Sequence, residues 1–357
     1  FFQFPLAPYI PGSSFNTKDE KFRFSKEKKN IIRTLDLLVI DEISMVRADL
    51  LDQIDAVLRL YKDKHRPFGG VQLLMIGDLS QLAPVVKENE WGMLREYYNT
   101  PYFFASHALR QTQHVTIELK HVYRQTDRCF IDILNEVREN RLTPESLERL
   151  NSRYIVAQSD SQLDEGIIRL TTHNATANQY NEERMDALKG VRFSFKAQIV
   201  GNFPESSYPA EEKLVLKKGC QVMFLKNDSQ GSRYYNGKLG IVSAVDAEKI
   251  CVRGIDDGME IEVEPDVWTN ARYVIDKETK EIREEIEGEF RQYPLRLAWA
   301  ITIHKSQGLT FDRAVLDVNA AFAAGQVYVA LSRCRSLEGL VLTAPLLASS
   351  VKTDVMV

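Results

Sequence analysis

Residues 35–42 read Leu-Asp-Leu-Leu-Val-Ile-Asp-Glu, an apolar run that ends in two adjacent carboxylates. The four apolar residues 37–40 are typical of a strand buried on both faces of a parallel sheet. Such a strand delivers the residues that follow it to the carboxyl edge of the sheet, where α/β proteins bind ligands. We therefore expect Asp41 and Glu42 to reach solvent there. In nucleoside triphosphatases a first acid holds magnesium and a second activates the attacking water, although most strands ending in Asp-Glu have no such role.

The composition is that of an ordinary globular protein. The 357 residues are 44% hydrophobic and 27% charged, and a chain of this length favours two or three domains. The net charge is −4, so a nucleic-acid-binding surface would have to be a local basic stripe on an acidic body.

The cysteines and the apolar runs bear on the compartment. Cys129, Cys220, Cys251 and Cys334 lack Cys-x-x-Cys spacing, which favours free thiols in a reducing compartment over a zinc site or disulfides. No apolar run approaches the roughly 18 residues that a membrane-spanning helix needs, and no signal sequence is evident. We expect no membrane association, and a cytoplasmic location, or a nuclear or mitochondrial one in a eukaryote.

A second strand end is expected near the two acids. Residues 46–61 have apolar side chains at helical spacing, and the strand predicted at 71–76 runs into Gly-Asp-Leu-Ser-Gln at 77–81. A strand, helix, strand unit brings both strand ends to one edge of the sheet. The Gln81 amide could there bind a water nucleophile and a γ-phosphate, although a turn capped by Asp78 would look similar.

The rest of the chain predicts a second α/β unit interrupted by β structure. We expect helices at 130–137 and from Thr143-Pro144, a strand at 166–170 that leads into Thr-Thr-His-Asn, and strands at 295–303 and 313–318. Residues 191–289 change to short alternating runs that predict a small all-β insertion, which we expect to be a barrel. The acid-rich residues 276–289 are expected to form a solvated hairpin.

Two further stretches carry polar chemistry. In residues 299–310 a buried strand breaks into a dense set of hydrogen-bonding side chains suited to phosphate and sugar contacts on a nucleic-acid strand. The helix predicted at 327–331 ends by presenting Arg333 and Arg335, which suits charge stabilisation in phosphoryl transfer. Arg124 alone would be a basic surface turn unless Tyr123 packs against it.

These motifs together resemble one family. The combination of V-I-D-E-I-S-M-V, G-D-L-S-Q-L-A-P-V, V-Y-R-Q, L-A-W-A-I-T-I-H-K-S-Q-G-L-T-F and V-Y-V-A-L-S-R-C-R-S is similar to the Pif-type, RecD-like DNA helicases of superfamily 1. The ordered match spans nearly the whole chain. It implies an α/β fold with two RecA-like parallel-sheet domains, the first incomplete, and a small β-barrel insertion in the second. The expected domains are 1–125, then 126–190 with 290–357, and the insertion 191–289; a duplex-separating wedge is expected at 8–26.

The resemblance also implies residue roles. Asp41 would hold Mg²⁺, Glu42 would activate water, Gln81 would sense the γ-phosphate of ATP, and Arg124 and Arg333 would be arginine fingers across a cleft, each worth roughly 10³ to 10⁵ in rate. ATP contacts would include Gly308. Single-stranded DNA and duplex junctions would be the partners of a monomeric motor that moves 5′ to 3′ in repair, recombination or genome maintenance. The expected DNA contacts are His173, Asn174, Thr302, His304, Lys305, Ser306 and Gln307.

One family motif is missing. The phosphate-binding pattern G-x-x-x-x-G-K-[ST] does not occur, and its nearest lookalike, residues 231–239, has one residue too many between its glycines and a leucine in place of the hydroxyl. We expect the chain to be a fragment of a longer helicase that hydrolyses little ATP alone. The alternative is an ATPase-inactive remnant that only binds nucleic acid.

Overall fold

The computed structural model describes residues 2, 4, 8–11, 24, 26–155, 166–228, 231–275, 282–317, 323–352, 354 and 356. The wedge expected at 8–26 lies mostly outside these residues. Two compact units divide the chain: Phe1–Lys120 with Arg272–Glu285 and Asp354–Val357, called unit 1 here, and His121–Ala271 with Ile286–Thr353, called unit 2. The domain boundaries expected from the sequence stay predictions.

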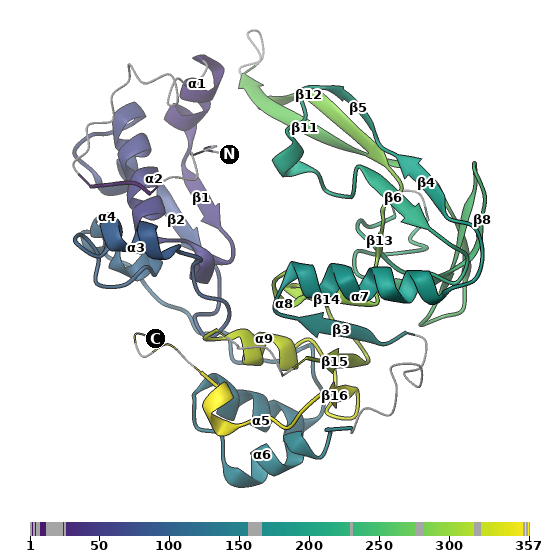
Figure 1. Cartoon of the computed structure of the whole chain (residues 1–357). Coiled ribbons are helices and arrows are strands. Elements are labelled where there is room, and N and C mark those ends of the chain that lie inside the picture. Colours follow the sequence, from purple (N-terminus) through teal and green to yellow (C-terminus); the bar gives the residue numbers. More distant parts are fainter. Residues whose placement is uncertain are drawn as a thin grey trace. The chain divides into compact units, whose positions relative to one another are not determined.

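Unit 1 contains the predicted strand, helix, strand unit (Figure 1). Strand β1 (Leu37–Ile40) pairs in parallel with β2 (Gln72–Met75), so that Ile40 lies opposite Met75. Between them run the short 3₁₀ helix η2 (Ile43–Met45) and α2 (Ala48–Tyr61), with α1 (Lys26–Thr34) packed against α2. The remaining helices of the unit are α3 (Glu88–Leu94) and α4 (His107–Arg110), with 3₁₀ helices η3 (Pro67–Gly70) and η4 (Phe103–Ala105).

The expected burial of β1 on both faces is wrong. The side chains of Leu38 and Ile40 pack against the core of unit 1, whereas Leu37 and Val39 are 46% and 51% exposed. Strand β2 repeats the alternation, because side chains along a strand point to opposite faces. A two-stranded sheet packed on one side buries only every second residue.

The middle of α2 is anchored by a buried carboxylate. Asp52 accepts hydrogen bonds from Tyr98 Oη (2.7 Å), Ser106 Oγ (2.5 Å) and the backbone N–H groups of His107 (3.1 Å) and Ala108 (2.9 Å). Four donors compensate the cost of burying one charge. The same bonds attach α4 and the chain before it to α2.

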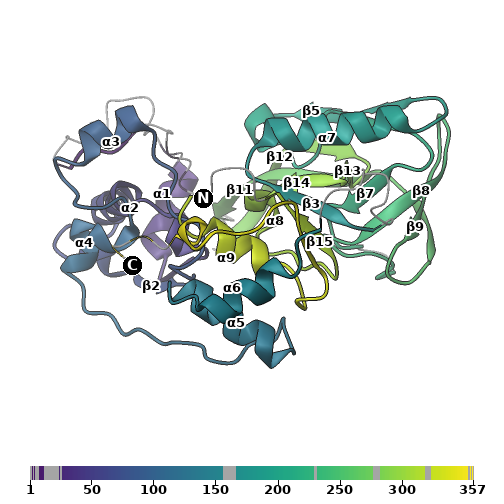
Figure 2. The ribbon, with the colours of Figure 1, turned by 60° about the horizontal axis from the view of Figure 1, so that its bottom comes forward.

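Unit 2 is built on a parallel sheet of order β14-β3-β15-β16, with β3 at Ile168–Thr171, β14 at Ala300–Thr302, β15 at Ala314–Leu316 and β16 at Leu340–Leu342. Helix α7 (Asn174–Ala187) lies along β3 and β14 (Figure 1). Helix α9 (Gln326–Leu331) connects β15 to β16 and contacts both α5 (Arg128–Arg138) and the short α8 (Ile303–Ser306); α8 and α9 lie side by side in Figure 2. Helix α6 (Pro144–Asn151) begins after Thr143, whose hydroxyl accepts from Ser146 N–H as an N-cap.

The β-rich insertion consists of separate sheets. A five-stranded antiparallel sheet has the order β10-β9-β8-β7-β13, a three-stranded sheet the order β11-β12-β5, and β4 pairs with β6. The bounds are β4 Phe193–Lys196, β5 Gln198–Gly201, β6 Lys213–Leu216, β7 Gln221–Phe224, β8 Leu239–Val245, β9 Ile250–Gly254, β10 Glu260–Val263, β11 Asp266–Ile275, β12 Ile282–Gln292 and β13 Leu295–Leu297.

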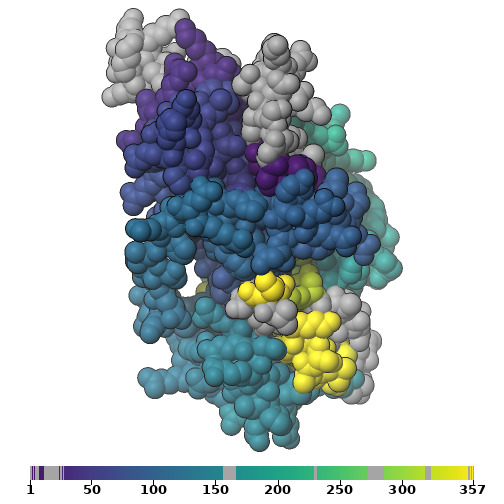
Figure 3. All heavy atoms as spheres, turned by 90° about the vertical axis from the view of Figure 1, so that its left-hand side faces the viewer, coloured from purple at the N-terminus to yellow at the C-terminus, as the bar shows by residue number. Residues whose placement is uncertain are grey.

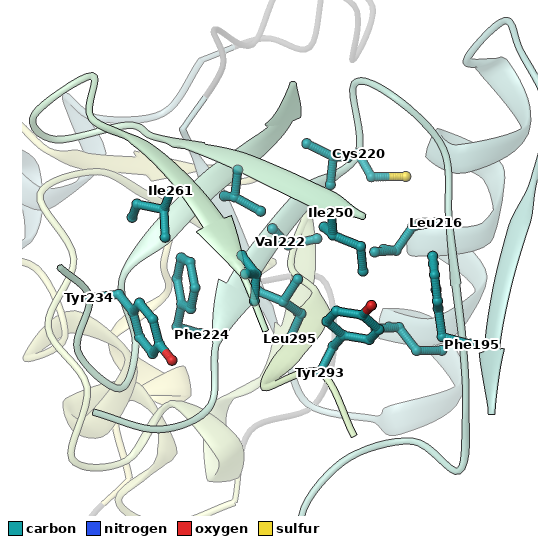
Figure 4. Packing of buried hydrophobic residues seen from close by; sticks show 14 of the residues in the cluster. Phe195, Leu216, Cys220, Val222, Phe224, Tyr234, Ile250, Ile261, Tyr293 and Leu295 are labelled. Atoms are coloured by element: carbon teal, nitrogen blue, oxygen red, sulfur yellow. The ribbon is translucent and has the colours of Figure 1, made fainter. Parts of the chain in front are cut away.

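The expected barrel is corrected by this strand order. Closure requires the two edge strands to pair, and in the described part of the chain β10 and β13 each have one neighbour. The α/β fold with parallel sheets is confirmed, but its insertion holds no closed barrel among these residues. The core between the sheets is apolar and includes Phe224 stacked on Tyr234 at 4.2 Å (Figure 4).

The single strand expected at 295–303 is wrong as well. The chain forms β13 in the antiparallel sheet and β14 in the parallel sheet, and breaks at Ala298 and Trp299. The Ala298 N–H donates to Gln221 O instead (2.9 Å). One mostly apolar stretch therefore belongs to two sheets, which periodicity cannot reveal.

Two observations concern the whole of the described chain. All four cysteines are free. None of the helices in the described ranges combines the length and the apolar character needed to cross a bilayer.

Candidate nucleotide and nucleic-acid sites

The acidic end of β1 in unit 1 is a strained turn. Asp41 is exposed and its Oδ1 accepts from the Glu42 N–H (2.8 Å). Glu42 has φ 50° and ψ 45°, a left-handed conformation that is uncommon for a residue with a side chain. Such strain persists only where the surroundings impose it, and it is frequent at functional sites.

The loop after β2 closes against this turn. The Ile43 N–H donates to Ile76 O (2.9 Å), and a Cβ on Gly77 would lie 3.0 Å from the Ile43 nitrogen. Only glycine fits without displacing the backbone that follows Glu42. The two strand ends therefore meet at one edge of the sheet, as the sequence predicts.

Gln81 is positioned by Asp78. The Asp78 carboxylate accepts from Ser80 N–H (3.0 Å) and from the Gln81 side-chain amide (3.4 Å), and Gln81 N–H donates to Asp78 O (3.0 Å). The loop is therefore a turn capped by Asp78, which was the alternative to a functional Gln81. The Gln81 side chain is half-buried in this turn.

The carboxylates of this edge are a donor set that fits Mg²⁺. No group of three or more His, Cys, Asp or Glu side chains capable of holding a metal occurs in the residues described. Mg²⁺ usually takes only one or two carboxylates and completes its shell with water and phosphate oxygens. The exposed carboxylate of Asp41 meets that requirement.

The two predicted arginines lie close together in unit 2, joined by Gln125. The Gln125 amide nitrogen donates to Ser332 O and Cys334 O, both at 3.0 Å, and Arg124 Nη1 donates to Ser332 O (3.4 Å). Tyr123 is 87% exposed and does not pack over Arg124 as the sequence suggested. Burial lowers the pKa of Arg124, and the charge of Tyr328 opposes this shift.

Arg333 is buried, with 2% of its surface exposed. Its guanidinium donates to Val329 O (2.9 Å), Ser332 Oγ (2.8 Å) and Leu309 O (3.4 Å). These bonds tie the end of α9 to the residue after Gly308. In this conformation Arg333 holds the polar segment in place, and reaching a phosphate would require its side chain to leave these acceptors.

The predicted DNA-contacting residues gather at the carboxyl edge of the parallel sheet. Thr302 at the end of β14 is in register with Thr171 at the end of β3. The Asn181 side chain on α7 donates to Ala300 O (2.9 Å) and accepts from Ala300 N–H (2.8 Å), which fixes the helix on β14. His173 and Asn174, at the start of α7, thus follow the end of β3, the strand that pairs with the end of β14 at Thr302.

The side chains of the polar segment differ in exposure. Thr302 and Ser306 are buried: Thr302 Oγ1 caps α8 by accepting from Lys305 N–H (3.3 Å), and Ser306 Oγ donates to Ile303 O (2.7 Å). His304 and Gln307 are half-buried, and Lys305, Gly308, His173 and Asn174 are exposed. The buried hydroxyls hold the turn, whereas the other side chains are open to a ligand.

The sequence analysis missed two residues of these sites. Gln125 follows Arg124 directly in the sequence. Only its hydrogen bonds to residues more than 200 positions away show that it links Arg124 to the Arg333 segment. Burial lowers the pKa of Lys305, and the nearby charge of Arg296 on β13 lowers it further. The charge of Glu211 opposes this shift. Burial also lowers the pKa of Arg296 itself. Two crowded cations favour an anionic ligand.

These features define an α/β protein of the RecA-like class. A family model described as PIF1-like helicase matches residues 9–146. The ATP-dependent DNA helicase PIF1 of Homo sapiens is 37% identical over 318 residues, which are 85% of this chain and 45% of the human protein. The ATP-dependent DNA helicase Pif1 of Bdellovibrio bacteriovorus is 33% identical over 89% of this chain and 69% of its own length.

Solved structures agree. A crystal structure of Bacteroides sp Pif1 in complex with ADP-AlF4 has a TM-score of 0.89 and 40% identity, covering 99% of this chain and 79% of that one. Bacteroides Pif1 bound to ssDNA has a TM-score of 0.68 and 39% identity, covering 99% and 80%. The chain belongs to the PIF1-like helicase family. It spans about half the length (45%) of the human relative.

Proposed function

We propose that this chain carries most of an ATP-driven DNA helicase motor that moves 5′ to 3′ on single-stranded DNA, in repair or recombination. The observation that carries the proposal is the edge of the parallel sheet of unit 2, where β3 and β14 end as neighbours and the residues that follow them, His173, Asn174 and Lys305, have exposed polar side chains. Relatives named ATP-dependent DNA helicases and a relative solved with ssDNA support it.

In the proposed mechanism Asp41 binds Mg²⁺ and Glu42 orients and deprotonates the attacking water. Mg²⁺ held by Asp41 would supply positive charge that neutralises the phosphate oxygens. Gln81 contacts the γ-phosphate, and Arg124 and Arg333 stabilise the charge that develops on it. We also propose that Lys305, His304 and Gln307, with His173 and Asn174, bind the DNA backbone, while Thr302 and Ser306 hold the turn. Gly308 contributes to nucleotide binding.

DNA binding is the first test. Labelled oligothymidylate would be titrated into the chain at several salt concentrations, where phosphate contacts give a linear fall of log K with log salt. Lys305→Ala should weaken binding and flatten the slope by about 0.7, and the exposed Lys218→Ala should not. A flat slope for the unmodified chain would exclude both the motor and a nucleic-acid-binding remnant.

ATP hydrolysis separates these two functions. The sequence contains no G-x-x-x-x-G-K-[ST] motif, and Arg333 is buried in its own unit, so the ATPase-inactive, DNA-binding alternative has support as well. We propose that the chain by itself hydrolyses little ATP. DNA-stimulated turnover in the range of about 1 to 10³ per second would show that this motif is dispensable. In a longer form of the protein that turns over ATP, Glu42→Gln should abolish turnover while DNA binding persists.

A further inference from the structure

A basic stripe runs along α1 in unit 1, outside every motif used above. Lys26, Lys29 and Arg33 are spaced by three and four residues, which places them on one face of the helix. Lys26 and Arg33 are exposed and Lys29 is half-buried. Ile31 and Ile32 occupy the opposite side and are buried in the unit. The helix is thus held by its apolar side and presents its cations outward.

Aromatic rings border the stripe. The Lys29 ammonium lies 6.0 Å from the centroid of the Tyr61 ring, and the Tyr61 ring lies 5.9 Å from that of Phe24. The charge of Arg33 counteracts the burial that raises the pKa of Tyr61, so Arg33 is close to this ring as well. Lys28 covers Phe24 at 4.6 Å. Cations interleaved with aromatic rings are the arrangement that binds nucleic-acid strands.

Among the described residues, the first carboxylate after α1 in the sequence is paired with a lysine outside the stripe. Lys62 lies 3.5 Å from the Asp36 carboxylate, so these two groups form a pair and add no net charge. The stripe is thus a cluster of cations in a chain whose net charge is −4, and α1 belongs to the part of the sequence that is purple in Figure 3.

The spacing of the stripe fits a phosphate backbone. Seven residues of helix separate Lys26 from Arg33, a distance of about 10 Å at about 1.5 Å per residue. One strand of duplex DNA carries a phosphate about every 3.4 Å of helix axis, so a duplex segment of this length carries about three phosphates per strand. Three cations meet about three anions.

We propose that the basic stripe of Lys26, Lys29 and Arg33 is a second binding site for the phosphodiester backbone of DNA, separate from the Lys305 segment of unit 2. The proposal rests on the proposed DNA-binding function. A single small anion could contact only one or two of these cations. A polyanion with regularly spaced charges could contact all three. Single-stranded and duplex DNA share this chemistry, so the test includes both.

The test compares two charge-matched triple variants of the whole chain. Lys26→Gln/Lys29→Gln/Arg33→Gln removes the stripe, and Lys189→Gln/Lys213→Gln/Lys218→Gln removes three exposed cations of unit 2. Fluorescence anisotropy would give the salt dependence of binding for an oligothymidylate and for a blunt duplex with the same number of phosphates. On the probe that the stripe contacts, the stripe variant should lower the slope of log K against log salt by about 2 to 3. Each lost phosphate contact lowers it by about 0.9 for duplex and about 0.7 for single-stranded DNA. The control should leave both slopes unchanged.

Each other outcome overturns the proposal. Equal losses in both variants would indicate general electrostatics, and no loss in the stripe variant would leave an acidic protein as the partner to consider. If the unmodified chain binds DNA normally, either of these results rejects the stripe but leaves the proposed function intact. A flat salt slope for the unmodified chain rejects the stripe and the proposed function together. Thermal unfolding checks the fold of each variant. The double variant Lys26→Gln/Arg33→Gln changes exposed residues only. It should lower the salt slope by about two thirds as much as the triple variant, because each phosphate contact contributes about equally.

Discussion

Gln125 is a single side chain that joins two motifs. Its amide nitrogen bridges the carbonyl groups of Ser332 and Cys334, on either side of Arg333, while Arg124 precedes it in the chain. It therefore determines how close the two arginines lie. A glutamine has the length and the two donor hydrogens that this bridge requires.

Gln125→Ala should leave two backbone carbonyls without their donor. We expect a loss of about 1 to 3 kcal/mol in the free energy of unfolding, measured by urea denaturation, since a lost buried hydrogen bond costs about that much. The exposed Gln113→Ala serves as the control and should change stability by less than about 0.5 kcal/mol. Equal effects at the two positions would contradict the bridging role.

The four thiols should differ sharply in reactivity. Burial raises the pKa of Cys334 to about 12, above the ordinary range of a thiol, so at neutral pH this group is protonated and inaccessible. Cys129 is partly exposed. Maleimide labelling followed by peptide mass mapping should modify Cys129 in the native protein, with Cys334 reacting only after denaturation. Native labelling of Cys334 at the rate of Cys129 would show that the end of α9 opens readily.

At the scale of elements, α2 is the scaffold of unit 1. Its N-terminal end follows the acidic turn, its apolar side packs under β1 and β2, and Asp52 attaches α4 to it. The position of Asp41 and Glu42 thus depends on a helix that the buried carboxylate of Asp52 helps to hold.

Asp52→Ala should remove the acceptor of four hydrogen bonds at once. We expect a loss of about 3 kcal/mol or more in the free energy of unfolding, because the N–H groups of His107 and Ala108 become buried and unsatisfied. Asp36→Ala is the matched control: Asp36 is 97% exposed, and a surface ion pair is worth less than about 1 kcal/mol. A loss as small as that of the control would mean that water replaces the carboxylate.

At the scale of the whole molecule, the described chain exposes much apolar surface on residues 113–120. Val115, Ile117 and Leu119 are 89%, 80% and 87% exposed, and they alternate with polar residues. Alternation is the pattern of a strand, yet no strand forms there. Backbone and side chains of such a segment are available to pair with another chain.

We therefore predict that the chain associates weakly at high concentration, in contrast to the expected monomer. Val115→Lys/Ile117→Lys should shift sedimentation-velocity profiles toward the monomer, because it removes apolar surface and adds charge. Gln113→Lys/Thr116→Lys adds the same charge at polar positions of the segment and should have a weaker effect. A wild-type chain that sediments as a monomer at every concentration would exclude this association.

The sequence by itself determined the family and the α/β class. It also determined that two parallel strands lead into the Asp41 turn and the Gln81 loop, and that the cysteines are free. These follow from local patterns: an apolar run, its period and the residues directly after it. Tertiary structure decided what local patterns do not contain. The outward face of β1, the open β sheets, the break at Trp299, the burial of Arg333 and the bridge from Gln125 all depend on which distant segments pack together, and those contacts span up to about 200 residues of chain.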